Sequence, residues 1–156
     1  MMEYLGFSFF FILSHILAYT IAGVIALGIS KDIYESKARL CDFLRDMADK
    51  QESKHVSRYF LPAQIIRGLL MSVILFPLLP AISDFPFHIS SLFFAGLMFV
   101  FTHLAAASPF IDNIEGWVYF KKKYIRKSAI AKFQTEMLTY AVLFGLLISM
   151  AMEWIL

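Results

Sequence analysis

Four long stretches of the chain consist almost entirely of apolar residues. They cover residues 5–30, 60–82, 87–108 and 133–156. Each stretch is close to or longer than the ~20 residues that an α-helix needs to cross a ~30 Å hydrocarbon layer. This pattern predicts an all-α integral membrane protein in which four transmembrane spans form a four-helix bundle. No linker, internal repeat or low-complexity tract separates the stretches, so we expect a single transmembrane domain over residues 1–156.

Polar residues and prolines make the second stretch the least regular of the four. Gln64 and Arg67 interrupt it near its start. Pro62 fits the first turn of a helix, where the missing N–H of proline costs nothing. Pro77 and Pro80 are expected to kink or end the same helix, because a proline inside a helix removes one backbone hydrogen bond.

The composition agrees with a membrane protein and excludes several other classes. Hydrophobic residues make up 60% of the chain and charged residues 17%. A soluble domain carries about 45–50% apolar and about 25% charged residues. The single cysteine, Cys41, cannot form an intramolecular disulfide. The composition therefore excludes a secreted disulfide-rich domain, a disordered chain and an ordinary cytosolic enzyme.

The basic residues are confined to one side of the predicted membrane. The 14 Lys and Arg residues lie between the first and second stretches, between the third and fourth stretches, or at Arg67. The opposite side carries Glu3, Asp84 and Glu153 and no Lys or Arg. Because loops rich in Lys and Arg stay in the cytoplasm, we expect a multi-pass protein of the inner (plasma) membrane with both termini outside.

The first cytoplasmic connection carries an amphipathic pattern. Ile33, Leu40, Leu44 and Met47 follow a helical spacing, and acidic and basic residues lie between them. This spacing predicts an amphipathic cytoplasmic helix over residues 31–50, between spans 1 and 2. Such a helix either packs on its own protein or docks a partner.

The second connection combines aromatic and basic residues next to the membrane. They are Trp117, Tyr119, Lys121, Lys122, Lys123, Arg126 and Lys127. Aromatic rings sit at the headgroup level, and each basic residue near an anionic surface contributes ~1 kcal/mol. We therefore expect these residues to contact anionic lipids of the inner leaflet. The alternatives are a simple orientation signal or recognition of a specific lipid headgroup, while the cluster is too short and too close to the bilayer for nucleic acid.

Small residues recur every fourth position along the first span. They are Ser14, Ala18, Ala22 and Ala26. A row of small side chains lets another helix approach closely, either within the chain or from a second copy. The row therefore predicts helix packing, and with it a homo-oligomer or a complex with a partner membrane protein.

Polar residues inside the last three spans are expected at similar depths, near the cytoplasmic face. They are Arg67, His103, Glu136, Gln64 and Thr102. Ionisable groups inside a membrane are costly and are therefore functional candidates. We expect one inner-leaflet cluster built on an ion pair between Arg67 and Glu136. The cluster then either registers the helices, binds a lipid headgroup or small anion, or forms part of a proton or ion path.

A second polar group lies near the middle of the first span. His15 and Tyr19 are four residues apart, so they share one helix face and can bond to a neighbouring span. A haem between His15 and His103 is not expected, because the two histidines lie at different depths. Neither a cofactor nor a metal ion is expected elsewhere in the chain.

No phosphate-binding loop, zinc-binding helix motif or serine elbow occurs in the sequence. This favours a small polytopic protein that acts by association with itself or a partner membrane protein, as an accessory subunit, an immunity or exclusion factor or an inhibitor. The first alternative is an oligomeric channel or transporter with a polar path near His15, His103 and Arg67. The second is a protein that binds or modifies lipids of the inner leaflet, and an enzyme is the less favoured class.

Overall fold

The computed structural model describes residues 2–35 and 40–155, which form helices joined by turns and contain no strand. The elements are α1 (Met2–Ile29), α2 (Lys31–Tyr34), α3 (Lys50–Ile74), η1 (Phe76–Leu78), α4 (Leu79–Ser83), α5 (Phe87–Gly96), η2 (Leu97–Leu104), α6 (Ile114–Tyr119) and α7 (Lys127–Ile155). η1 is a 3₁₀ turn and η2 is a π-helix that continues α5. The predicted all-α class is confirmed.

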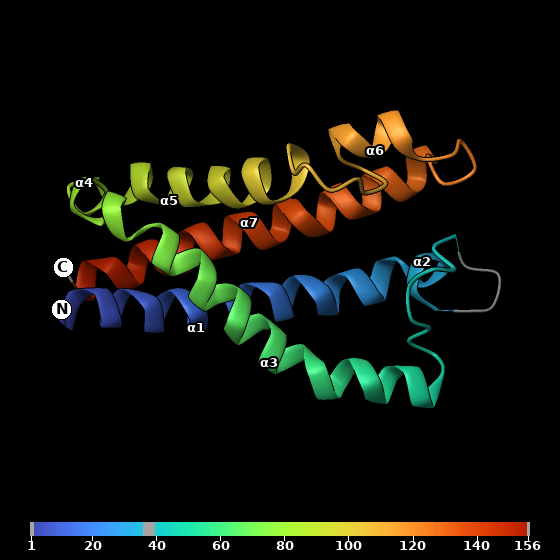
Figure 1. Ribbon diagram of the computed structural model, residues 1–156, viewed down its shortest axis with the longest axis horizontal. Coiled ribbons are helices and arrows are strands. Elements are labelled where there is room, and N and C mark those ends of the chain that lie inside the picture. The colour runs from blue at the N-terminus through green and yellow to red at the C-terminus, as the bar shows by residue number, and fades with distance from the viewer. Residues whose placement is uncertain (1, 36–39, 156) are drawn as a thin grey trace.

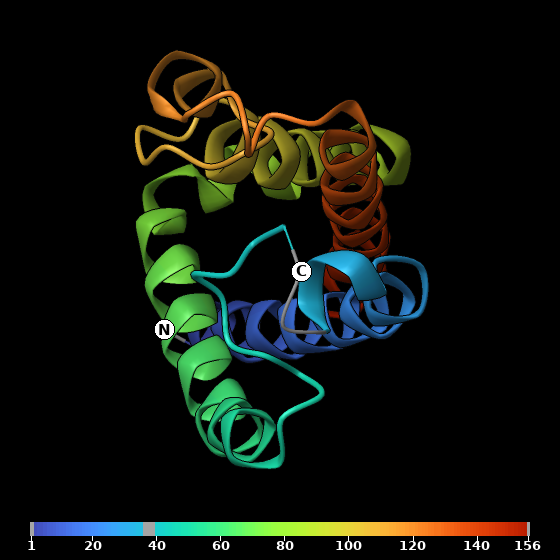
Figure 2. The same cartoon turned by 90° about the vertical axis from the view of Figure 1, so that its right-hand side faces the viewer.

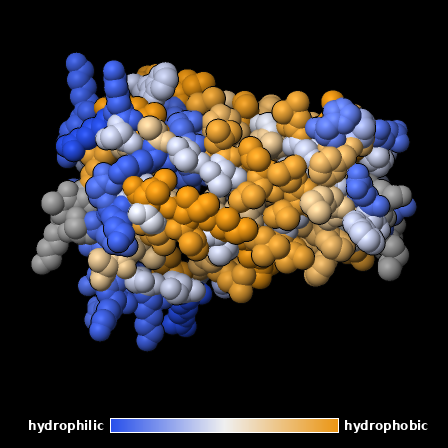
Figure 3. Space-filling view, turned by 180° about the vertical axis from the view of Figure 1, so that it is seen from behind, coloured by the Kyte–Doolittle hydropathy of each residue, from blue (hydrophilic) through white to orange (hydrophobic). Residues whose placement is uncertain are grey.

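Within residues 2–35 and 40–155, three helices are long and apolar enough to cross a membrane. They are α1, α5 continued by η2, and α7. α3 and the segment from Phe76 to Ser83 are long and apolar enough to cross a membrane only when they are taken together, and the two are bent by 43° relative to each other. Helices α1, α5 and α7 run along the long axis of the molecule and α3 crosses it obliquely (Figure 1), and apolar side chains cover the middle of the face shown in Figure 3. The chain is therefore a membrane protein with three membrane-long helices, or four if the bent pair forms one span.

Two different local signals set the bounds of α3. The side chain of Asp49 accepts hydrogen bonds from the backbone N–H groups of Gln51 and Glu52, so the helix begins ten residues earlier than expected. Pro62 consequently lies inside the helix and not in its first turn, which corrects the prediction. The helix ends at Ile74, just before the expected proline Pro77, which lies in the 3₁₀ turn that follows. The bend of the chain lies at this point, because a proline cannot continue the hydrogen bonds of the preceding helix.

The main core forms where α7 packs against α1 on one side and α5 on the other. Aromatic rings fill this core, and the ring centroids of Phe11 and Phe144 lie 4.8 Å apart. Ser14, Ala18, Ala22 and Ala26 are all buried within the single chain. The small-residue row is therefore used for packing within the chain.

α7 approaches α5 through a second set of small residues. A Cβ atom on Gly145 would lie 2.4 Å from the carbonyl oxygen of Ser91 and 3.0 Å from the Cβ of Ala95. One turn further along, the hydroxyl of Ser149 donates a hydrogen bond to that of Ser90 over 2.8 Å. The two helix backbones are therefore close enough that only glycine fits at position 145.

We call the end of the molecule that holds α2, α6 and the first residues of α3 and α7 the basic end. The expected amphipathic helix over residues 31–50 is wrong for the described part of this segment. Only Lys31–Tyr34 is helical, residues 40–49 form turns, and residues 36–39 lie outside the described residues. Asp46 and Asp49 accept hydrogen bonds from nearby backbone N–H groups, which favours turns over a helix.

The apolar side chains of this connection build a second, smaller core at the basic end. Ile33 and Cys41 are buried with Ile111, Ala129 and Phe133. Tyr34 and Lys132 add polar contacts, because the Tyr34 hydroxyl donates to Glu136 and Lys132 pairs with Asp32. α2 is therefore docked onto the first turns of α7.

Replacing Gly145 with Ala tests the close contact between α5 and α7. The added methyl group would overlap the backbone of Ser91, so we expect a loss of about 1–3 kcal/mol in the free energy of unfolding. Chemical unfolding in detergent micelles measures this loss. Gly96→Ala is the matched control, because a Cβ there meets nothing within 4 Å. Equal stability of the two variants would contradict the close contact.

Candidate functional site

A polar cleft of about 270 Å³ opens towards the basic end, and we call it the Arg67 cleft. α1, α3, η2, α7 and the segment after η2 all contribute to its walls. The lining residues are Tyr19, Arg67, Thr102, His103, Ala106, Ser108, Pro109, Phe110, Asn113 and Met137. The cleft thus brings together three members of the expected polar cluster, namely Arg67, Thr102 and His103.

Arg67 is the charged group of this cleft. Its guanidinium carbon lies 5.9 Å from the centre of the Tyr19 ring, and its side chain is half-buried. Among the described residues, no carboxylate oxygen lies within 4.0 Å of the guanidinium. Because arginine stays protonated in proteins, the cleft holds a positive charge without an anionic partner from the described chain.

Glu136, the expected partner of Arg67, points elsewhere. It accepts a hydrogen bond of 2.7 Å from the hydroxyl of Tyr34 on α2. Burial, together with the nearby Glu136 carboxylate, raises the pKa of the Tyr34 hydroxyl, which keeps the hydroxyl protonated as the donor. Glu136 therefore fixes α2 on α7 and does not pair with Arg67.

The π-helix η2 delivers Thr102 and His103 to the cleft. Its wider turn is visible in the hydrogen bond of 2.8 Å from the N–H of Ala105 to the carbonyl of Val100, five residues earlier. The Thr102 hydroxyl donates to the carbonyl of Met98 over 2.6 Å. π-Helical turns are rare and frequently mark functional sites.

Asp112 holds His103 in place from behind the cleft. Its Oδ2 lies 2.8 Å from Nε2 of His103 and accepts a second bond from the side chain of Gln134. The carboxylate is completely buried, and its Oδ1 makes no hydrogen bond to the described residues. His103 is therefore buried with its Nε2 bonded to this carboxylate.

Sequence reasoning missed Asp112, because it lies in the connection after the third apolar stretch and was read with the loop charges. Nothing in the local pattern distinguishes it from exposed acidic residues such as Glu115. Only the fold shows that this carboxylate is buried beside a histidine.

A single asparagine shapes the wall formed by residues 108–116. The side-chain oxygen of Asn113 accepts from the N–H groups of Phe110 and Gly116, and its amide donates to the carbonyl of Ser108. Gly116 is required here, since a Cβ atom would lie 1.4 Å from the carbonyl oxygen of Phe110. These contacts also start α6 at the correct place.

His15 forms a separate network that joins three helices. Its Nε2–H donates to the Oε1 of Gln64 over 2.9 Å, and its Nδ1 accepts from the hydroxyl of Tyr140 over 2.8 Å. The Tyr19 ring packs 5.8 Å from the His15 ring and also lines the Arg67 cleft. Gln64 therefore belongs to the His15 network and not to the cleft, and both ring nitrogens of His15 have protein partners.

The aromatic and basic residues of the second connection lie on the outside of the basic end. The rings of Trp117 and Tyr119 are 60% and 70% exposed. Lys121, Lys122, Lys123, Arg126 and Lys127 are also exposed. A hydrogen bond with Tyr124 raises the pKa of Lys123, so this side chain stays charged. Figure 3 shows hydrophilic side chains gathered at this end.

No protein-family model, curated protein or solved structure matches this chain. Among the described residues, no three His, Cys, Asp or Glu side chains are grouped so that they could hold a metal ion. The most developed site of the described chain is therefore the Arg67 cleft, which combines one unpaired cation with hydroxyl, imidazole and amide groups.

Replacing Asn113 with Ala tests how the cleft wall is held. Three backbone groups lose their partner, and each buried unsatisfied group costs about 1–3 kcal/mol. We expect faster hydrogen exchange at the N–H groups of Phe110 and Gly116, measured by mass spectrometry in detergent. Ser108→Ala is the control, because only its backbone carbonyl contacts Asn113. Unchanged exchange in the Asn113 variant would show that the wall does not depend on this side chain.

Proposed function

We propose that this chain is a four-span membrane protein that binds an anionic, phosphate-like group in the Arg67 cleft at the cytoplasmic face. The observation that carries the proposal is the guanidinium of Arg67, which lies in an open cleft without a carboxylate partner among the described residues. Guanidinium groups bind phosphates through two parallel hydrogen bonds. Thr102 and His103 line the same cleft, but their side chains are bonded to Met98 and Asp112, which leaves Arg67 as the main donor for an anion.

The energetic cost of Arg67 supports a ligand. An arginine at the centre of a membrane helix costs ~2.5–3.5 kcal/mol, and less towards an interface. An internal ion pair would offset this cost, but the described acidic side chains near the cleft have other partners. Asp112 is bonded to His103 and Gln134, and Glu136 is bonded to Tyr34. An external anion is therefore the natural counter-charge.

The distribution of charge supports the four-span topology. The bent pair of α3 with η1–α4 counts as one span in this proposal, and its break lies close to the end opposite the basic end (Figure 1). The first residues of α1 and the last of α7 lie together at that opposite end. Because Lys and Arg mark the cytoplasmic side, the basic end faces the cytoplasm of an inner or plasma membrane.

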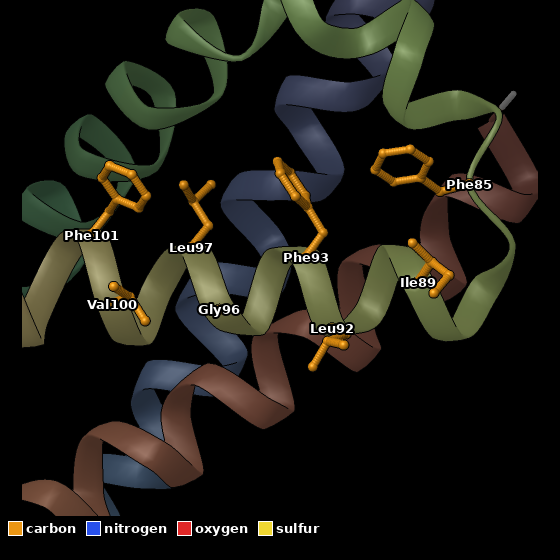
Figure 4. Close-up of a pocket in the computed structure, with 8 residues that line it drawn as sticks. All are labelled: Phe85, Ile89, Leu92, Phe93, Gly96, Leu97, Val100 and Phe101. Carbon is orange, nitrogen blue, oxygen red and sulfur yellow. The ribbon is translucent and has the colours of Figure 1, made fainter.

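Association with a partner membrane protein is the second candidate function. An entirely apolar groove of about 500 Å³ runs along the outer face of α5 and η2 (Figure 4). Gly96 lies in its middle and has free space around the position of a Cβ atom. A glycine in an apolar groove allows close approach of another transmembrane helix. This groove, and not the small-residue row of α1, is the surface that favours an accessory-subunit role.

Replacing Arg67 with Gln tests anion binding directly. The change removes the charge while keeping polar atoms, so we expect binding of a phosphatidic acid to fall about tenfold or more. Native mass spectrometry of the purified protein in detergent measures the bound lipid. Arg58→Gln is the matched control on the same helix, because Arg58 is exposed outside the cleft. Equal lipid binding by both variants would exclude Arg67 as the anion site.

Labelling of introduced cysteines tests the topology. Gln51 and Asp84 are both exposed and lie at opposite ends of the bent pair. In a Cys41→Ser background, a membrane-impermeant maleimide should label Asp84→Cys in intact cells and Gln51→Cys only after lysis. The reverse pattern would place the basic end outside and remove the cytoplasmic assignment of the cleft.

A further inference from the structure

A second cavity opens beside the Arg67 cleft, between α3 and η2. This α3–η2 groove has a volume of about 310 Å³. Its lining is apolar except for one threonine, and consists of Leu70, Met71, Ile74, Leu75, Leu97, Met98 and Thr102. Leu70 and Ile74 are 63% and 77% exposed, so the groove is open on the side that faces the bilayer.

The packing of the four long segments explains why this groove exists. α3 makes its extensive contacts with α1, α1 packs on α7, and α7 packs on α5. Seen from the basic end, these segments occupy four sides of the molecule (Figure 2). Among the described elements, α3 and η2 make few direct contacts with each other, which leaves an open side between them. The apolar groove occupies this open side.

The groove lies next to the Arg67 cleft. Thr102 lines both cavities. Arg67 lies three and four residues before Leu70 and Met71, so these side chains share one face of α3. Met98 lies one turn before Thr102 on the facing helix, and the Thr102 hydroxyl bonds to its carbonyl. A ligand that touches Arg67 therefore has an apolar channel directly beside it.

The direction of the groove matches that of a lipid chain. From Arg67 to Ile74 the helix advances ~10 Å away from the basic end. An acyl chain of an inner-leaflet lipid also runs from its headgroup at the cytoplasmic face towards the middle of the membrane. A soluble anion would use the polar cleft alone and would leave the apolar groove unexplained.

We infer that the ligand of the Arg67 cleft is a single anionic lipid whose phosphate contacts Arg67 and whose acyl chain lies in the α3–η2 groove. This inference rests on the proposed function, since it names the source of the anion bound there. The positive charge of Arg67 supplies recognition of the phosphate, and the open side of the groove lets the lipid enter laterally from the bilayer.

Filling the groove tests the inference separately from the headgroup site. Leu70→Trp places a large ring in the groove, whereas Val73→Trp places the same ring on an exposed position of α3 outside it. Binding of dioleoyl phosphatidic acid and of water-soluble glycerol phosphate is measured for the wild type and both variants. We expect Leu70→Trp to weaken binding of the long-chain lipid about tenfold, and Val73→Trp to leave it unchanged. Glycerol phosphate binding should be the same in all three proteins.

The outcomes separate the two claims. Equal loss for the long-chain lipid and for glycerol phosphate in Leu70→Trp would mean that the ring disturbs the headgroup site, and the acyl-chain assignment would then fail. Unchanged lipid binding in Leu70→Trp, with loss in Arg67→Gln, would also overturn the assignment and leave the anion site standing. Binding of neither probe by the wild type would instead overturn the proposed function. A folding defect is recognised separately, by a shifted elution of the variant in size-exclusion chromatography in detergent, so loss of both probes counts against the acyl-chain assignment only in a variant that elutes like the wild type.

Discussion

The close approach of α7 to its two neighbours determines the rest of the structure. Gly145 lets the backbone of α7 lie against that of α5, and the small residues of α1 are buried beside α7 on the other side. Small side chains let two helices stay in van der Waals contact along much of their length. Inside a membrane this packing matters because burial of apolar surface does not drive helices together. Since α7 is occupied on both sides, α3 makes its extensive contacts with α1. The open side between α3 and η2, with its polar cleft and apolar groove, is the consequence.

Buried polar groups hold this arrangement in register. His15 on α1 bonds to Gln64 on α3 and to Tyr140 on α7, so one side chain links three helices in the apolar interior. A partner for each ring nitrogen avoids the cost of an unsatisfied polar group away from water. Sliding any of the three helices by one residue would break at least one of these bonds. The network therefore fixes the height of Arg67 relative to Thr102 and His103.

The apolar stretches of the sequence were sufficient to predict the all-helical class and the order of the long helices, but not where the helices begin. α3 starts at Lys50 because Asp49 caps it, a contact that depends on the turns before it. The predicted amphipathic helix failed because Ile33 and Cys41 are buried by residues from the second connection and α7. Periodicity along a segment cannot show which distant segment covers its apolar side chains. Arg67, Thr102 and His103 were expected near one another because counting residues from the span ends gives them similar depths in the membrane. In the structure they line the same cleft.

The depth of a residue along its helix does not show in which direction its side chain points. Glu136 and Met137 are adjacent, and consecutive residues on an α-helix are rotated by about 100°. Met137 lines the Arg67 cleft, whereas Glu136 faces Tyr34 on α2. The same rotation decides the electrostatics of the site. With Glu136 bonded to Tyr34 and Asp112 bonded to His103, these two described carboxylates near the cleft have donors of their own. The positive charge of Arg67 is therefore left for an anion that comes from outside the chain, and the groove beside it makes the surrounding lipid the nearest source.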